Sequence, residues 1–105
     1  MERLTPTQVK ERIDAGANIV LLDVREQWEY DTCRIGGSRL MPMNRVPAEA
    51  GTLDRQSEIV VLCHHGMRSL QVAVWLERAG FERVANLEGG IDAWSCDVDP
   101  NVPRY

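Results

Sequence analysis

Residues 59–79 read IVVLCHHGMRSLQVAVWLERA. The first four residues are all aliphatic, which is typical of a strand that helices bury on both faces. From residue 69 to residue 79 apolar side chains recur at helical spacing, and Gly80 suits the left-handed position that follows a helix. The stretch therefore predicts a buried strand and a helix, joined by a loop that begins at Cys63.

The remainder of the chain alternates short helices and short apolar strands in the same way. A capping box, Thr5-Pro6-Thr7-Gln8, begins a first helix that Gly16 ends. The further predicted segments are a strand at 19–22 followed by Asp23, a helical or irregular turn at 25–31, a strand at 40–43, one or two helical turns at 44–51, a strand at 84–87 and a short helix at 89–94. This alternation predicts one α/β domain over residues 1–105, a sandwich in which helices cover both faces of a mostly parallel sheet.

The last residues, 95–105, are expected to form a C-terminal tail that runs extended over the surface. This tail contains Pro100 and Pro103 and has no apolar periodicity.

The composition argues against several classes of protein. With 105 residues, of which 44% are hydrophobic, the chain is sized for one hydrophobic core. Its net charge of −4 argues against general binding to nucleic acid or to anionic membranes. No apolar stretch is long enough to span a bilayer, and the charged start MER lacks the core of a signal peptide. We therefore expect a soluble, cytoplasmic protein. No long amphipathic seam favours assembly, so we also expect a monomer.

Cys63 lies where the predicted central strand ends and its helix begins. The free N–H groups and the positive dipole end of a helix favour an anion at this position, and hence the thiolate form of a cysteine. Cys63 is therefore predicted to be a nucleophile. Asp23 also follows a strand, and because reactive groups of parallel sheets gather beyond the carboxyl ends of the strands, we expect it in the same crevice.

The other two cysteines, Cys33 and Cys96, are expected to be small packed side chains, since neither lies between a strand and a helix. Three cysteines without a Cys-x-x-Cys pair predict neither a disulfide framework nor a standard zinc site. A metal site of Cys63, His64 and His65 is disfavoured as well, because adjacent ligands rarely close a tetrahedral shell.

Three motifs resemble those of single-domain rhodaneses, a family of sulfurtransferases. They are Cys63-x-x-x-x-Arg68, Asp23-Val-Arg25-Glu-x-x-Glu29-Tyr30 and Leu87-Glu-Gly-Gly-Ile-Asp-Ala-Trp94. The resemblance implies the rhodanese-like fold and a persulfide mechanism, in which Cys63 takes the outer sulfur of a donor such as thiosulfate and passes it to a thiophilic acceptor, a small molecule or a protein. A cradle of backbone N–H groups would hold the sulfur, and no metal or organic cofactor is needed.

The residues that follow Cys63 are the predicted substrate-binding set: His64, His65, Gly66, Met67 and Arg68. The two histidines would attract an anionic donor or bind its oxygens; alternatively, one packs against the loop while the other is solvated. Gly66 suits a positive φ or a close backbone approach. Met67 would form an apolar wall or pack in the core, and Arg68 would reach the anion or pair with a carboxylate that fixes the loop.

Asp23 and Arg25 resemble the Asp-x-Arg pair that ties neighbouring loops together in this family, so we expect them to support the site. The alternative is an ordinary surface ion pair. The chain departs from many relatives at residues 33–38, CRIGGS, where it lacks a histidine. Cys33 would serve as a second, relay thiol if it lies near Cys63.

Two other functions stay open at the level of sequence. Tyrosine phosphatases and arsenate reductases are the nearest chemical rivals, but the phosphatase loop is one residue longer between its cysteine and arginine, so the loop length here favours sulfur over phosphate. A non-enzymatic module would instead carry sulfur for a protein partner, such as a cysteine desulfurase, or bind a partner. The small size of the chain and the weakly basic loop motivate this alternative.

Overall fold

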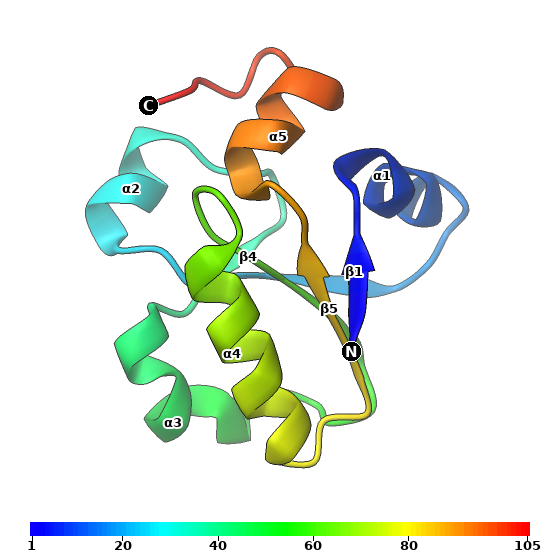
Figure 1. Ribbon diagram of the computed structural model, residues 1–105, viewed down its shortest axis with the longest axis vertical. Helices are drawn as coiled ribbons and strands as arrows, with labels where there is room; N and C mark the ends of the chain where they lie inside the picture. Colours follow the sequence, from blue (N-terminus) through cyan, green and yellow to red (C-terminus); the bar gives the residue numbers. More distant parts are fainter.

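Strand β4 (Glu58–Leu62) is the centre of a five-stranded sheet in the computed structural model, which describes residues 1–105. It lies between β2 (Ile19–Asp23) and β5 (Arg83–Leu87), and the edge strands are β3 (Arg39–Leu40) and β1 (Glu2–Leu4). All neighbouring strands are parallel, so their carboxyl ends meet at one edge of the sheet (Figure 1). The predicted parallel sheet is confirmed.

Five α-helices connect the strands. They are α1 (Pro6–Asp14), α2 (Gln27–Thr32), α3 (Val46–Glu49), α4 (Met67–Arg78) and α5 (Gly90–Asp97), with 3-10 turns at Met43–Arg45 and Ala50–Thr52 on either side of α3. None of these helices combines the length and the apolar character that crossing a membrane requires.

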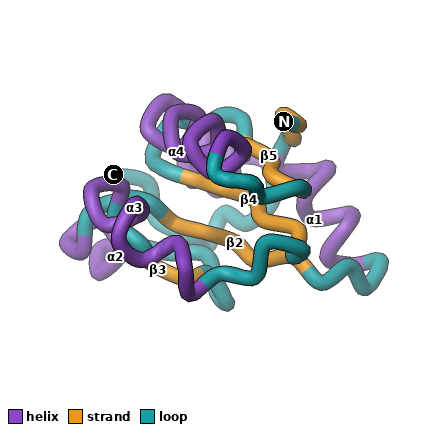
Figure 2. Tube along the Cα trace, turned by 90° about the horizontal axis from the view of Figure 1, so that it is seen from below, coloured by secondary structure: helices purple, strands orange, loops and turns teal.

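The hydrophobic core has two parts, one on each face of the sheet, because successive side chains of a strand point to opposite faces. On β4, Ile59 and Val61 pack with buried residues of α3 and α4, whereas Val60 and Leu62 pack with buried residues of α1 and α5. Figure 2 shows α4 and α1 on opposite sides of the strands. These four side chains are fully buried, and each burial stabilises the fold by roughly 1.5–3 kcal/mol. Helices thus cover both faces, as predicted.

The helix starts follow local signals in the sequence. The Thr5 side chain accepts a hydrogen bond from the Gln8 backbone at 3.2 Å, and the Gln8 side chain accepts one from the Thr5 backbone at 2.9 Å, so the predicted capping box is present. Helix α4 begins at Met67 rather than at the predicted residue 69, because Gly66 adopts a left-handed conformation (φ +107°) as its N-cap.

The edge strands agree less well with the sequence. β1 is not predicted at all, since a strand of three residues with one buried side chain, Leu4, leaves no periodic signal. β3 contains only Arg39 and Leu40 instead of residues 40–43. The chain beyond it stays hydrogen-bonded beside β2, where the Met41 and Met43 amides donate to the carbonyls of Asp23 and Val24.

The prediction that residues 95–105 form an extended surface tail is wrong for most of this segment. Residues 95–97 complete helix α5, and the next two amides, of Val98 and Asp99, both donate to the Trp94 carbonyl. Val102 is then buried in the core beside α1 and α5. Burial of this valine favours a folded return of the chain over an extended path.

Candidate active-site loop

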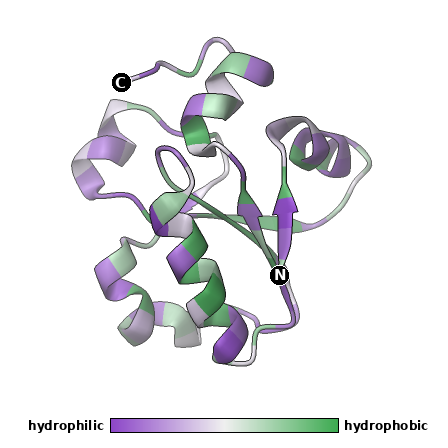
Figure 3. Ribbon diagram, in the orientation of Figure 1, coloured by the Kyte–Doolittle hydropathy of each residue, from purple (hydrophilic) through white to green (hydrophobic).

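The loop that joins β4 to α4 lies beside the first turn of α5 (Figure 1). The amides of Ile91 and Asp92 donate to the carbonyls of Cys63 and His64, at 2.9 and 3.2 Å. Figure 3 colours the loop as hydrophilic and the strand that leads into it as hydrophobic. The loop is therefore held by backbone hydrogen bonds from α5 where the central strand ends.

Two glycines make the geometry of this loop possible. Gly66 has a φ of +107°, as the sequence predicts for this position. Gly90 approaches the loop so closely that a Cβ atom built on it would overlap the carbonyl oxygens of Cys63 and His64. A residue with a side chain at position 90 would collide with the backbone that carries the sulfur.

Cys63 lies at the base of the loop, where its side chain is 1% exposed. The Gly66 amide donates to Sγ at 3.0 Å. Gly66 supplies the one backbone hydrogen bond to this sulfur, whereas we expected a cradle of several N–H groups. The thiol is therefore almost completely shielded from solvent in this structure.

Two buried polar residues contact the loop that the sequence did not single out. Ser69, in the first turn of α4, accepts a hydrogen bond from the Cys63 thiol at 3.4 Å, and Ser69 in turn donates to the Asn86 side chain of β5. Both residues are at most 1% exposed. A polar residue between two apolar neighbours of a strand is the signal that could have revealed Asn86 in β5, because burying an amide is costly unless it is hydrogen-bonded.

Arg68 pairs with a carboxylate, which was one of its two predicted roles. Its guanidinium donates to both oxygens of Glu29, at 2.6 and 2.9 Å. The Glu29 side chain is only 5% exposed, and the hydrogen bonds from Arg68 lower its pKa to about 2, against the opposing effect of burial. The same ion pair raises the pKa of Arg68. Glu29, which the sequence indicated only as part of a motif, thus ties α2 to the end of the loop.

The two loop histidines stack on each other, although adjacent side chains are expected to diverge. Their ring centroids lie 3.9 Å apart, and the Tyr105 ring stacks on the other side of His64 at 4.0 Å. Burial, followed by the charge of His65, lowers the pKa of His64. The His65 side chain remains largely exposed and lies 4.0 Å from the carboxylate of Asp92. One histidine therefore packs and the other is solvated, as one of the two interpretations held.

Tyr105 also joins the polar contacts beneath the loop. Its hydroxyl donates to Glu29 at 2.5 Å and accepts from Arg25 at 3.1 Å. Burial, together with the Glu29 hydrogen bond, raises the pKa of Tyr105 to about 12. The end of the chain is thereby attached to the same carboxylate that holds Arg68.

Asp23 and Arg25 form a fully buried ion pair, so the alternative of a surface pair is wrong. The shortest distance between them is 2.7 Å, and both side chains are 0% exposed. Arg25 also donates to the carbonyls of Glu29 and Cys33, at 3.2 and 2.7 Å. Burial is the largest single effect and lowers the pKa of Arg25, but the hydrogen bonds and charges of Asp23 and Tyr105 together outweigh it and raise this pKa. The pair connects the end of β2 with the segment that contains α2.

The remaining candidate residues are Met67 and Cys33. Met67 is 71% exposed, so it does not pack in the core. Cys33 is buried beside Arg25, whose guanidinium lies 3.9 Å from its sulfur, and all three cysteines are free. No group of three His, Cys, Asp or Glu side chains is arranged to hold a metal ion.

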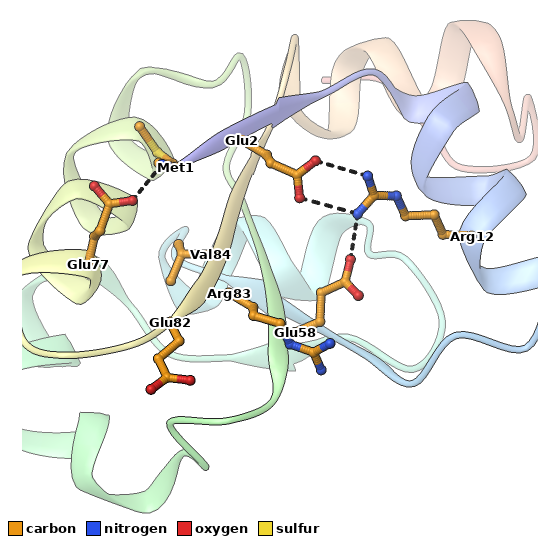
Figure 4. Close-up of a pocket in the computed structure, with 8 residues that line it drawn as sticks. All are labelled: Met1, Glu2, Arg12, Glu58, Glu77, Glu82, Arg83 and Val84. Atoms are coloured by element: carbon orange, nitrogen blue, oxygen red, sulfur yellow. Dashed lines mark hydrogen bonds and ion pairs between the residues drawn. The ribbon is translucent and has the colours of Figure 1, made fainter.

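The two cavities of the molecule do not include Cys63. The larger, about 300 Å³, lies at the amino-terminal end of β4, where Arg12 bridges the carboxylates of Glu2 and Glu58 (Figure 4). The second, about 260 Å³, is an apolar groove between α3 and α4 that includes Val46 and Trp75. Neither cavity therefore opens onto the Cys63 sulfur.

Comparison with known proteins agrees with this geometry. The family model of the Rhodanese-like domain matches residues 5–97. The chain is 35% identical over 100 residues to the putative sulfurtransferase YtwF of Bacillus subtilis, a match that covers 95% of this chain and 96% of YtwF. It is 34% identical over 86 residues to the putative sulfur carrier protein YrkF of the same organism, covering 82% of this chain and 46% of YrkF.

A longer relative and a solved structure extend this similarity. The chloroplastic Rhodanese-like/PpiC domain-containing protein 12 of Arabidopsis thaliana is 39% identical over 89 residues, which cover 81% of this chain. The chain spans only 30% of the length of that protein. The crystal structure of SSP1007 from Staphylococcus saprophyticus superposes with a TM-score of 0.86 at 31% identity, covering 99% of this chain and 100% of the other.

Proposed function

The chain belongs to the Rhodanese-like domain family, and from this membership we propose that it is a sulfurtransferase in which the sulfur of Cys63 carries the transferred atom. The relatives named as sulfurtransferase or sulfur carrier support sulfur transfer as the class of reaction. The observation that carries the proposal is the hydrogen bond from the Gly66 amide to Sγ at the end of the central strand. A positive amide hydrogen aimed at a sulfur favours its anionic form.

The proposed reaction has two steps. In the first, the Cys63 thiolate attacks the outer sulfur of thiosulfate, the S–S bond of the donor breaks, and sulfite leaves with the electron pair. In the second, an acceptor such as cyanide attacks the outer sulfur of the resulting persulfide, and the electron pair returns to Sγ as thiocyanate leaves. The moving atom stays covalently attached between the steps, so the proposal requires no metal or organic cofactor.

The residues around Cys63 support this reaction mainly by holding the loop. Arg68 brings a positive charge to the loop but is engaged by Glu29, so its proposed role is electrostatic support of the sulfur anion. The exposed His65 stands at the rim of the loop, where it is suited to attract an anionic donor. Asp23 and Arg25 are proposed to keep the neighbouring segments in place beneath the loop.

The first test is direct detection of the carried sulfur. After incubation with thiosulfate and removal of excess donor, intact-mass measurement is expected to show the addition of one sulfur atom, and peptide mapping is expected to locate it on Cys63. Added cyanide should discharge it as thiocyanate. Cys63→Ser should show neither the added mass nor thiocyanate formation.

A matched control is Cys96→Ser, because Cys96 is also a free cysteine but is exposed on α5. This variant should take up and release sulfur like the wild type. Equal sulfur loading of Cys63→Ser and wild type would overturn the assignment of Cys63. Hydrolysis of an aryl phosphate that depends on Cys63 would favour the phosphatase alternative instead.

The second candidate is a sulfur-carrier module that a protein loads, and the similarity to YrkF favours keeping it. The burial of Cys63 supports it too. A partner protein that docks on the loop can move the side chains that cover the sulfur, whereas a small donor makes too few contacts with them to do so. The two functions differ in turnover. Multiple turnovers with thiosulfate and cyanide alone would contradict the carrier, and loading only by a persulfide-bearing protein would support it.

A further inference from the structure

Beneath the Cys63 sulfur lies a small polar cluster formed by Ser69, Asn86 and the backbone of Gly66. Ser69 is 0% exposed and Asn86 is 1% exposed. The sheet around them is apolar, and buried hydroxyl and amide groups destabilise a fold unless they are hydrogen-bonded. This cluster is fully bonded, and one of its contacts is to the reacting atom.

The Ser69 hydroxyl has one proton and a choice of acceptors. Its oxygen lies 3.4 Å from Sγ of Cys63, and it also reaches the Gly66 carbonyl at 3.2 Å and the Asn86 side-chain oxygen. A thiol can donate to Ser69, which leaves the serine proton for Asn86. A sulfur anion can only accept, so rotation of the hydroxyl toward Sγ then provides a charge-assisted hydrogen bond, which is about twice as strong as a neutral one.

Asn86 is connected to the sulfur through Gly66. Its Nδ2 donates to the Gly66 carbonyl at 3.3 Å, while the Gly66 amide donates to Sγ at 3.0 Å. Gly66 has a left-handed conformation that the chain must hold in place. The Asn86 side chain therefore both accepts from Ser69 and positions the residue whose amide contacts the sulfur.

We propose that Ser69 is a further catalytic residue and Asn86 its positioning partner, and that the Ser69 proton turns toward Sγ whenever this atom is an anion and toward Asn86 when it is not. The catalytic effect of Ser69 rests on the proposed function, because it concerns the steps in which Cys63 takes up and releases sulfur. When thiosulfate loads Cys63, the negative charge leaves Sγ for the outer sulfur of the persulfide. When an acceptor attacks that outer sulfur, the S–S bond breaks and charge returns to Sγ as the leaving group. Ser69 thus assists the discharge step more than the loading step.

The decisive variant is Ser69→Ala, with Ser95→Ala as its control. Ser95 is a buried serine of α5 whose hydroxyl has no hydrogen-bond partner. Single-turnover discharge of the persulfide by cyanide should slow about tenfold to a hundredfold in Ser69→Ala, as expected on removing a hydrogen bond from a developing charge. Loading by thiosulfate at a fixed alkaline pH should change less than about threefold. Ser95→Ala should match the wild type in both steps.

A second measurement does not depend on sulfur transfer. The rate of Cys63 alkylation by iodoacetamide is followed against pH by peptide mass spectrometry, which separates Cys63 from the exposed Cys96. The profile of Ser69→Ala should move to higher pH, and that of Asn86→Asp should move further, because Asp adds a negative charge and loses the donor to Gly66. Thermal melting of each variant confirms that it is folded at the temperature of the assay.

The possible outcomes separate the two proposals. If Ser69→Ala discharges its persulfide as fast as Ser95→Ala and has the same alkylation profile, the role of Ser69 is overturned. If the wild type accepts sulfur from neither thiosulfate nor a protein persulfide, the proposed function fails, and the alkylation profiles alone then support or overturn the contact between Ser69 and the sulfur anion.

Discussion

Glu29 is the residue on which the contacts of the candidate site converge. Its carboxylate accepts from both Arg68 and Tyr105, and its backbone carbonyl accepts from Arg25. Because the hydrogen bonds from Arg68 and, to a smaller extent, from Tyr105 lower its pKa to about 2 from an ordinary 4.5, the carboxylate stabilises the fold fully above about pH 4.5. That contribution is lost as the pH falls toward 2, and it is at most roughly 3 kcal/mol at neutral pH.

We therefore expect Glu29→Gln to lower the free energy of unfolding at pH 7 by up to about 3 kcal/mol and to flatten its pH dependence below pH 4.5. Urea unfolding at several pH values measures both effects. The control is Glu49→Gln, whose exposed carboxylate is 4.0 Å from Arg45 and should change stability by less than about 0.5 kcal/mol. Identical acid dependence of the Glu29 variant and the wild type would contradict the prediction.

Gly90 provides a second prediction for a single residue. Gly90→Ala places a methyl group against the carbonyls of Cys63 and His64 at a φ of +60°. We expect a loss of stability of about 1–3 kcal/mol or more, together with lower sulfur loading of Cys63. Gly36→Ala is the control, since no atom lies within 4 Å of a Cβ at that position. Chemical unfolding of the two variants compares them, and equal stability would show that the loop adjusts freely.

Among the elements, the turn and tail that follow α5 differ most from expectation. They return to the loop, where Tyr105 stacks on His64 and contributes to the burial that lowers the pKa of this histidine. In Tyr105→Ala the pKa of His64 should rise toward its usual value of about 6.5, because burial is the largest cause of the shift. Titration of the histidine NMR signals measures this rise.

The matched variant for this prediction is Tyr105→Phe. It keeps the stacked ring but removes the hydroxyl that contacts Glu29 and Arg25. The pKa of His64 should therefore stay close to that of the wild type, while stability falls by about 1–2 kcal/mol because a buried donor–acceptor group is lost. A His64 signal that titrates alike in both variants would mean that the ring does not bury this histidine.

For the whole molecule, the parallel sheet predicts an order of local stability. β4 is paired on both sides and its aliphatic side chains are fully buried, whereas β3 has two residues at the edge of the sheet. Hydrogen exchange followed by NMR should find the slowest amides in β4 and in the central parts of β2 and β5, and faster exchange in β1 and β3. Equal protection of edge and central strands would contradict this order.

Much of the fold could be predicted because its signals are local. Three features each indicate the conformation of the backbone around them: the aliphatic run 59–62, the capping box at Thr5 and the glycine at position 66. The structure confirms all three. The short strand β1 and the folded return of the tail carry no such local signal. The burial of Leu4 and Val102 depends on the distant residues that they pack against. Edge strands and chain ends depend on distant contacts.

The same distinction separates what the sequence alone determines from what the tertiary structure decides at the site. The position of Cys63 after a buried strand and before a helix follows from residue order, because strand burial and helix capping are short-range effects. The pairing of Arg68 with Glu29 and the contact of Ser69 with Asn86 join residues far apart in the chain. Asp23 and Arg25 are neighbours in sequence, but their complete burial depends on the elements packed around them. Only the packing of helices onto both faces of the sheet brings these groups together, and their hydrogen bonds are strong because that packing excludes water.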